Sequence, residues 1–251
     1  MCLILFAYQS HPVYKLIVAA NRDEFLQRPT APAHFWEDEP SLLAGRDLEK
    51  MGTWMGVTKV GRFAAITNYR DPNETSDGKQ SRGKLVKDAL TYHGKIADYM
   101  KKLEKTYSRY PGYNLLVGDL NQLYYYSNVG KSLEKVKPGI HGLSNDLLNT
   151  SWPKVEKGKE GLAQMIKGDN LAQNLLELLQ NTDRPNDHLL PKTGVSLEWE
   201  RILSSLFIQT KGYGTRSSTI LLMSDTDIQY VERTFSGSEI SDQTFRFPIE
   251  P

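Results

Sequence analysis

Short apolar runs separated by turn residues dominate the hydrophobic pattern of this chain. The first two runs, 3–8 and 14–20, flank the turn-like segment 9–12 and predict a β-hairpin at the N-terminus. Three further pairs of the same kind follow, at 53–58 with 62–68, at 113–118 with 122–127 and at 219–224 with 228–235. Successive hairpins of this kind predict antiparallel sheets.

Segments with helical spacing stand between these hairpins. Helices are expected over 81–90, 95–107, 152–167, 171–180 and 198–207. Ser81 is expected to cap the first of them, because serine is a common N-cap residue. The leucines of 171–180 give that helix a broad apolar face, which suits the outer layer of a sandwich. The proline-rich and aromatic segment 27–40 has no period, so a long ordered loop is expected there.

Composition narrows the class of protein. A chain of 251 residues with no internal repeat, low-complexity segment or linker is expected to form a single domain over 1–251. Its net charge of +1 gives no reason to expect a nucleic-acid or anionic membrane partner. No stretch approaches the roughly 18 apolar residues that span a bilayer, and the N-terminal run lacks the features of a signal peptide. One cysteine fits a reducing compartment, so a cytoplasmic protein is expected.

That cysteine, Cys2, stands at the start of the first hairpin. Antiparallel pairing places the start of one strand beside the end of the next, so Cys2 should lie close to the polar residues 21–23. Processing that removes Met1 would give Cys2 a free α-amine, whose reference pKa of about 7.7 to 8.0 lets it accept the thiol proton. Arg22 would favour the thiolate, and Asp23 would orient the amine or the guanidinium.

A structural interpretation fits the same residues. Free cysteine often serves as a small buried hydrophobe in a strand. A polar run such as Asn21 to Glu24 after a strand is commonly a solvated loop. The residues alone leave both interpretations open.

Seven blocks of sequence run in order from the N-terminus nearly to the C-terminus. They are MCLILFAY at 1–8, ANRDEF at 20–25, RPTAPAHFW at 28–36, GTWMGV at 52–57, RFAAITNYR at 62–70, HGLSN at 141–145 and YGTRSST at 213–219. Together they resemble the NRDE family, whose eukaryotic members are called transport and Golgi organisation proteins. That family is similar to the choloylglycine hydrolases and penicillin V acylases, which are N-terminal nucleophile hydrolases. The resemblance therefore implies an α+β fold, the four-layer αββα sandwich with antiparallel sheets.

The resemblance also implies catalytic roles. Cys2 would be the nucleophile, and the side chains of Asn68 and Asn145 would form the oxyanion hole. Arg216 would be an active-site arginine that steadies Cys2 and the developing negative charge. Without the resemblance, the two asparagines also fit turns or loops, and Arg216 fits a structural salt bridge.

Arg22 and Asp23 complete the implied catalytic set. The hydrolases separate their arginine and aspartate by other residues, whereas here the two are contiguous. Asn21 therefore competes with Arg22 for the role of the hydrolase arginine.

The function expected from this resemblance is hydrolysis of a linear amide or related acyl bond of a small molecule. The residues expected to contact that substrate are Asn21, Glu24, Phe35, Trp36 and Tyr69. For Phe35 and Trp36, packing against the sheet is the alternative. The histidines show no metal-ligand spacing, so neither a metal nor a cofactor is expected.

Two other functions stay open. One is a non-catalytic protein that binds a small ligand in the same pocket, either a lipid-like acyl group or haem. Haem would need an axial ligand, which Cys2, His11 or a tyrosine could supply. The other is a scaffold that acts through protein partners.

Overall fold

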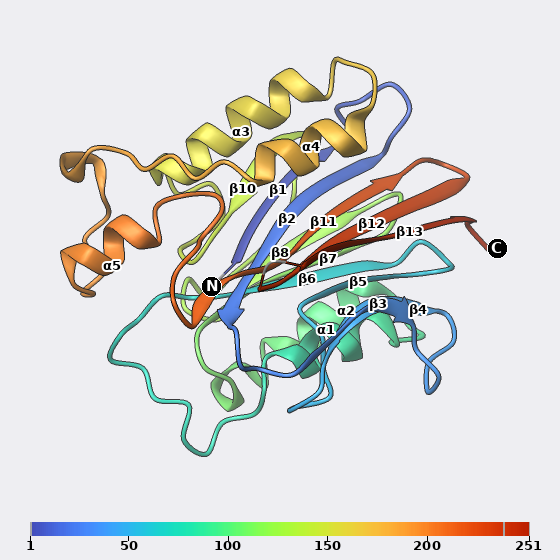
Figure 1. The fold of residues 1–251 in the computed structure, drawn as a ribbon. Helices are drawn as coiled ribbons and strands as arrows, with labels where there is room; N and C mark the ends of the chain where they lie inside the picture. Colours follow the sequence, from blue (N-terminus) through green and yellow to red (C-terminus); the bar gives the residue numbers. More distant parts are fainter. Residues whose placement is uncertain (1, 238, 251) are drawn as a thin grey trace.

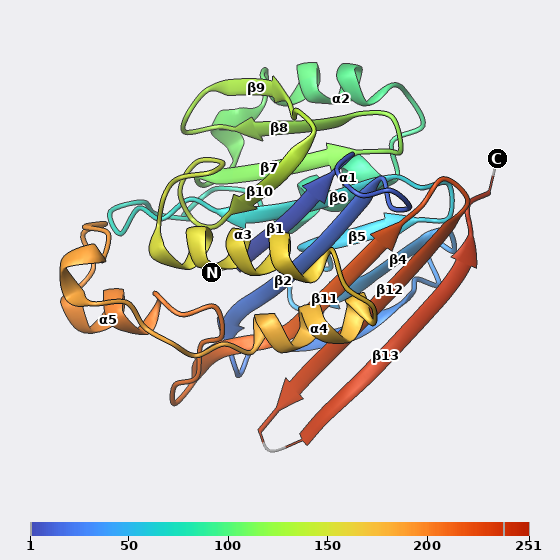
Figure 2. The same cartoon turned by 90° about the horizontal axis from the view of Figure 1, so that it is seen from above.

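Two antiparallel β-sheets packed face to face form the centre of the molecule. The computed structural model describes residues 2–237 and 239–250. Figure 1 shows helices on the outer face of each sheet, and Figure 2 shows the first sheet and its helices from above. This arrangement confirms the predicted αββα sandwich.

The first sheet contains six strands within the described residues, in the order β10-β1-β2-β11-β12-β13. In chain order they are β1 (Cys2–Tyr8), β2 (Leu16–Phe25), β10 (Gly139–Leu143), β11 (Tyr213–Met223), β12 (Asp227–Ser236) and β13 (Glu239–Pro248). The N-terminal hairpin is confirmed by the pairing of β1 with β2. However, β2 continues to Phe25, so residues 21–24 lie within a strand and the solvated-loop interpretation is wrong.

The second sheet contains seven strands, again counting described residues, in sequence order from β3 to β9. They are β3 (Thr30–Phe35), β4 (Leu42–Asp47), β5 (Met55–Thr58), β6 (Phe63–Asn68), β7 (Tyr113–Gly118), β8 (Leu123–Ser127) and β9 (Ser132–Lys135). The loop predicted over 27–40 was wrong, because part of it forms β3. Pro32 is tolerated there because β3 is an edge strand whose register shifts between Ala31 and His34.

Helices cover the outer faces of both sheets. The helices of the described residues are α1 (Gly83–Leu90), α2 (Ile96–Leu103), α3 (Pro153–Met165), α4 (Leu171–Leu179) and α5 (Leu197–Ile202), with 3₁₀ turns at Tyr107–Arg109 and Asp187–Leu189. The short helix α5 lies beyond the end of the first sheet (Figure 1). The helices α3 and α4 pack on the first sheet, and α1 and α2 pack on the second. None of the helices in the described ranges is long and apolar enough to cross a membrane.

The start of α1 differs from its prediction. Arg82, not Ser81, is the N-cap residue, and it makes no side-chain cap hydrogen bond. The Ser81 carbonyl instead accepts a hydrogen bond from the Lys84 N–H, which forms a turn before the helix. The predicted Ser81 cap was therefore wrong.

Alternation along β1 divides its side chains between two cores. Cys2, Ile4 and Phe6 belong to the core between the sheets, whereas Leu3 and Leu5 belong to the core under α3 and α4. The side chain of Cys2 therefore faces the second sheet.

Candidate functional site

Cys2 is the first residue of β1 and pairs directly with Arg22 of β2. Only 9% of Cys2 is exposed. Burial raises the pKa of the Cys2 thiol, while the charge of Arg22 and a hydrogen bond with the Asp23 backbone act in the opposite direction. The net direction is upward, so the thiol is protonated near neutral pH and needs a base to become a nucleophile.

A cavity of about 420 Å³ opens beside Cys2. A volume of this size is within the range typical of small-molecule sites. Its wall includes Arg22 and Glu24 from β2, Asn68 from β6, and Arg82 from the turn before α1. The cavity therefore joins the end of the N-terminal hairpin to the second sheet.

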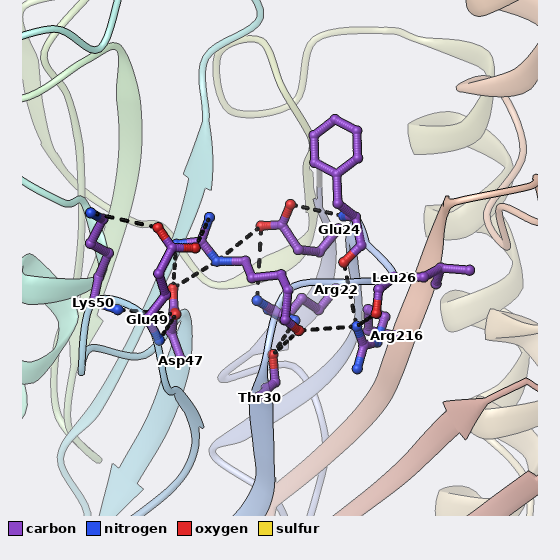
Figure 3. Close-up of polar contacts among 10 residues, drawn as sticks. Arg22, Glu24, Leu26, Thr30, Asp47, Glu49, Lys50 and Arg216 are labelled. Atoms are coloured by element: carbon purple, nitrogen blue, oxygen red, sulfur yellow. Dashed lines mark hydrogen bonds and ion pairs between the residues drawn. The ribbon is translucent and has the colours of Figure 1, made fainter.

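Polar side chains link the two sides of this cavity, as Figure 3 shows. The guanidinium of Arg22 donates to the Thr30 hydroxyl at 3.3 Å and lies 3.8 Å from the Glu24 carboxylate. Arg28 lies 3.9 Å from Glu24 and makes a closer ion pair of 2.6 Å with Asp47 of β4. Both sheets thus contribute charged groups to one connected network.

Asp23 lies on the opposite face of β2 from Arg22, toward the layer of α3 and α4. Its carboxylate accepts a hydrogen bond of 2.8 Å from the Thr215 hydroxyl of β11. Burial raises the pKa of Asp23, and the charge of Lys154 lowers it. Lys154 is itself buried in α3, and burial lowers its pKa to about 8. Asp23, a buried acid, and Lys154, a buried base, therefore lie on the helix-facing side of β2, opposite Arg22.

Asn68, the last residue of β6, and Asn145, which follows β10, lie in contact. The Asn145 amide donates to the Asn68 backbone carbonyl at 2.9 Å. The Ser144 hydroxyl lies 3.2 Å from the Cys2 carbonyl oxygen and 3.3 Å from the Asn145 side-chain oxygen. Asn68 lines the cavity, and Asn145 connects its strand end to Cys2 through Ser144. The structure thus brings Cys2, Asn68 and Asn145 together.

Arg216 occupies a different position. It falls where the β11 register against β2 shifts between Thr215 and Ser217. Its guanidinium donates to the Leu26 carbonyl at 2.6 Å, and also to the carbonyls of Phe25 and Arg28. These bonds, drawn in part in Figure 3, hold the chain segment that follows β2.

Asn21 lies on the helix-facing side of β2. Its amide donates to the carbonyls of Leu179 and Leu206, and its side-chain oxygen accepts from the Ser218 hydroxyl at 2.6 Å. Asn21 is fully buried. Its polar groups therefore join β2 to α4, to β11 and to the segment after α5.

Three aromatic residues expected to contact substrate lie outside the cavity lining described above. Trp36 is buried, and its indole N–H donates to the Ala44 carbonyl at 3.0 Å. Phe35 packs between the sheets against two phenylalanines of β13. Tyr69 makes a backbone hydrogen bond of 2.9 Å to Gly112. For Phe35 and Trp36, these contacts match the alternative of packing against the sheets.

The sequence interpretation missed Arg82 and Lys154. Arg82 carries no signal in the sequence, because only the packing of α1 on the second sheet brings it to the cavity. Lys154 did carry one. It shares the buried face of α3 with Gly158 and Leu162, at helical spacing. A lysine on an apolar helical face could have been recognised as a buried charge.

Metal and haem ligands were the last candidates among these residues. Among the described residues, no group of three or more His, Cys, Asp or Glu side chains could hold a metal ion. The described lining of the cavity includes Cys2 but no histidine.

Comparisons with known proteins agree with this fold. A family model described as "Transport and Golgi organisation 2" matches residues 1–237. The Transport and Golgi organization protein 2 homolog of Homo sapiens is 34% identical over 100% of both chains. The corresponding protein of Drosophila melanogaster is 30% identical over 94% of this chain and 93% of its own length. These matches confirm the predicted family resemblance.

Solved structures extend the likeness to hydrolases. The Caenorhabditis elegans ortholog of N-acylethanolamine-hydrolyzing acid amidase has a TM-score of 0.50 at 12% identity, covering 88% of this chain and 92% of its own. A C2A mutant of conjugated bile acid hydrolase from Clostridium perfringens has a TM-score of 0.51 at 10% identity, covering 98% and 96%. At these identities the likeness shows a shared fold.

Proposed function

The chain belongs to the Transport and Golgi organisation 2 family, and we propose that it is an N-terminal cysteine hydrolase of a linear amide or related acyl bond in a small molecule. The observation that carries the proposal is the position of Cys2, at the start of β1 in the wall of a polar cavity. The fold shared with two hydrolases supports it. One of those structures is a C2A mutant, so that hydrolase also has a cysteine at position 2.

The first chemical step needs the free amine of Cys2. Removal of Met1, which lies outside the described residues, would supply it. The amine accepts the thiol proton, and the sulfur forms a bond to the substrate carbonyl carbon. A base is required because burial keeps the thiol protonated. Arg22, which pairs with Cys2, favours the thiolate, and Asp23, the next residue of β2, orients the amine.

The protonated amine of Cys2 then acts as the acid in the remaining steps. The protonated amine returns the proton to the leaving nitrogen, the C–N bond breaks and a thioester forms on Cys2. Water then attacks the thioester with the amine as base, which releases the acid and restores the thiol. Asn68, with its strand end fixed by Asn145, donates to the oxyanion, and loss of one such donor typically costs about a hundredfold to a thousandfold in rate.

Intact mass of the purified protein tests the first requirement. A mass without Met1 is expected, together with turnover of some member of a panel of linear amides and thioesters. Cys2→Ser and Cys2→Ala should abolish that turnover. A matched variant with one glutamate inserted between Met1 and Cys2 keeps the thiol but blocks the amine, so it should be inactive as well.

Two results would contradict the proposal. They are retention of Met1 in the native protein, and full activity of the inserted-glutamate variant. Retention of Met1 would instead favour a protein that binds a small ligand in this cavity without turnover.

A further inference from the structure

The cavity beside Cys2 carries an excess of positive charge although the whole chain is nearly neutral. The basic residues in its wall are Arg22, Arg28, Arg46, Lys50, Lys79 and Arg82. The acidic residues in the same wall are Asp23, Glu24 and Asp47. Since the net charge of the chain is only +1, the cations are concentrated at this site. A concave site lined by one sign of charge attracts ligands of the opposite sign.

Most of these cations already have a carboxylate partner. Arg28 lies 2.6 Å from Asp47, and Arg46 forms a two-bond pair with Asp38 at 2.7 and 2.8 Å. Lys79 makes an ion pair of 2.9 Å with a glutamate. Their charges are therefore largely compensated within the protein.

Arg82 is different. In the described part of the chain it makes no ion pair, and its one hydrogen bond goes to the Gly112 carbonyl at 3.0 Å. Burial lowers the pKa of Arg82, and the charge of Glu74 acts against this. Arg82 and Cys2 line the same cavity. An arginine has five N–H donors in a fixed fork, and one hydrogen bond leaves most of them available.

Arg22 faces the same cavity from the first sheet. Among the described contacts, its one ion pair is the long one of 3.8 Å to Glu24. Arg22 of β2 and Arg82 of the turn before α1 therefore line the same cavity as Cys2, and neither has a close carboxylate partner among the described contacts. A ligand between them would meet two guanidinium groups beside the reacting sulfur.

We propose that the substrate carries an anionic oxygen group, a carboxylate or a phosphate, close to its scissile bond, and that Arg82 together with Arg22 binds this group. Arginine suits both groups because its planar fork matches their oxygens with two parallel hydrogen bonds. The few apolar side chains in the wall, such as Trp54 and Ile66, leave little surface for a long neutral acyl chain at Cys2. Calling this ligand a substrate rests on the proposed hydrolase function, but the test of the anion site needs no turnover.

Alkylation of Cys2 provides that test, because Cys2 is the only cysteine in the chain. Iodoacetate is anionic and iodoacetamide is neutral, and both alkylate a thiol with loss of iodide. The ratio of their rates at Cys2, divided by the same ratio for N-acetylcysteine amide, reports how strongly the cavity favours an anion. We expect the iodoacetate-to-iodoacetamide rate ratio at Cys2 to be about tenfold higher than that of N-acetylcysteine amide. An increase of this size is typical of electrostatic attraction in a charged cleft.

Three variants locate the effect. Arg82→Gln should lower the ratio about tenfold, and Arg82→Lys, which keeps the charge, should retain most of it. Arg46→Gln removes one positive charge from the same wall, but from an arginine already paired with Asp38, and should leave the ratio within about twofold of wild type. Equal falls in Arg82→Gln and Arg46→Gln would attribute the effect to net charge and overturn the proposal. Thermal unfolding by circular dichroism checks that each variant is folded.

Protection of the wild-type protein gives an answer without any variant. At constant ionic strength, glutarate or inorganic phosphate should slow alkylation by iodoacetamide more than glutaramide does. Stronger protection by glutarate identifies a carboxylate, and stronger protection by phosphate identifies a phosphate group. Equal protection by all three would overturn the anion site. Anion protection without amide turnover would instead contradict the hydrolase and leave the anion site standing.

Discussion

Burial sets the charge state of the residues around Cys2. The thiol of Cys2 and the carboxyl of Asp23 have raised pKa values, and the ammonium of Lys154 has a lowered one, with burial the main cause in each case. All three shifts favour the neutral form. Charged forms at this site therefore depend on nearby groups of opposite charge, such as Arg22 for a Cys2 thiolate.

Lys154 gives a prediction about pH. Its pKa of about 8 in the folded protein is below the reference value of about 10.4, so the unfolded chain binds more protons between these two values. Stability should therefore rise by about 3 kcal/mol from this group as the pH increases from about 8 to about 10.5. Urea unfolding of wild type and Lys154→Gln over this range measures it, since the difference between the two cancels other titrating groups. Parallel curves for the two proteins would contradict the prediction.

Asn145 gives a prediction about stability. Its amide donates to the Asn68 carbonyl from a position only 1% exposed. Asn145→Asp places a carboxylate against that carbonyl, so we expect a loss of about 3 kcal/mol in the free energy of unfolding. Asn145→Ala, which removes the donor without adding a charge, should cost about 1 to 2 kcal/mol. The control Asn121→Asp, in an exposed turn, should change stability by less than about 0.5 kcal/mol.

The residues around Cys2 are positioned mainly by the register of strand pairing, and less by loops. The pairing of β2 with β1 on one side and β11 on the other fixes Arg22 beside Cys2 and Asp23 beside Thr215. The sequence predicted the first of these contacts, because hairpin geometry follows from two apolar runs and a turn. It did not predict the second, because β11 is distant in sequence and its pairing with β2 shifts in register between Thr215 and Ser217.

The hydrogen bonds of Arg216 should stabilise residues 25–28, and a substitution of Arg216 tests this. Arg216→Ala removes the donor to three backbone carbonyls at the end of β2 and just after it, and we expect a loss of about 1 to 2 kcal/mol in stability. Hydrogen exchange at the Arg28 amide, which bonds to the Phe25 carbonyl, should become faster. The control Arg233→Ala breaks an ion pair with Asp242 between β12 and β13, and should leave exchange at Arg28 unchanged. Unchanged exchange in Arg216→Ala would show that the segment is held by other contacts.

At the scale of the whole molecule, the sequence predicted the four layers but not every strand in them. The hairpins were visible because apolar runs alternate with turns. The strands β9 and β13 were not, because they are exposed at sheet edges and mostly polar. The strand β13 pairs along the whole of β12. Arg82 was missed for a related reason, since its place at the cavity depends on how α1 packs against the second sheet.

The start of α1 packs so closely against Gly52 that the effect of adding one methyl group there can be predicted. A Cβ on Gly52 would lie 2.6 Å from the backbone carbon of Gly83, the first residue of α1, and backbone cannot rotate away as a side chain can. Gly52 lies between β4 and β5, so Gly52→Ala should push the start of α1 away from this segment and lower the free energy of unfolding by about 1 to 3 kcal/mol. Gly168→Ala is the matched control, because its nearest contact would be an ordinary 3.7 Å. Chemical denaturation measures both variants.

Because Arg82 immediately precedes Gly83, the same displacement should move its guanidinium away from Cys2. The iodoacetate preference of Cys2 should then fall in Gly52→Ala and persist in Gly168→Ala, although neither variant changes a charge. A destabilised Gly52→Ala that kept the full preference would mean that the anion is held without the close contact between Gly52 and the start of α1.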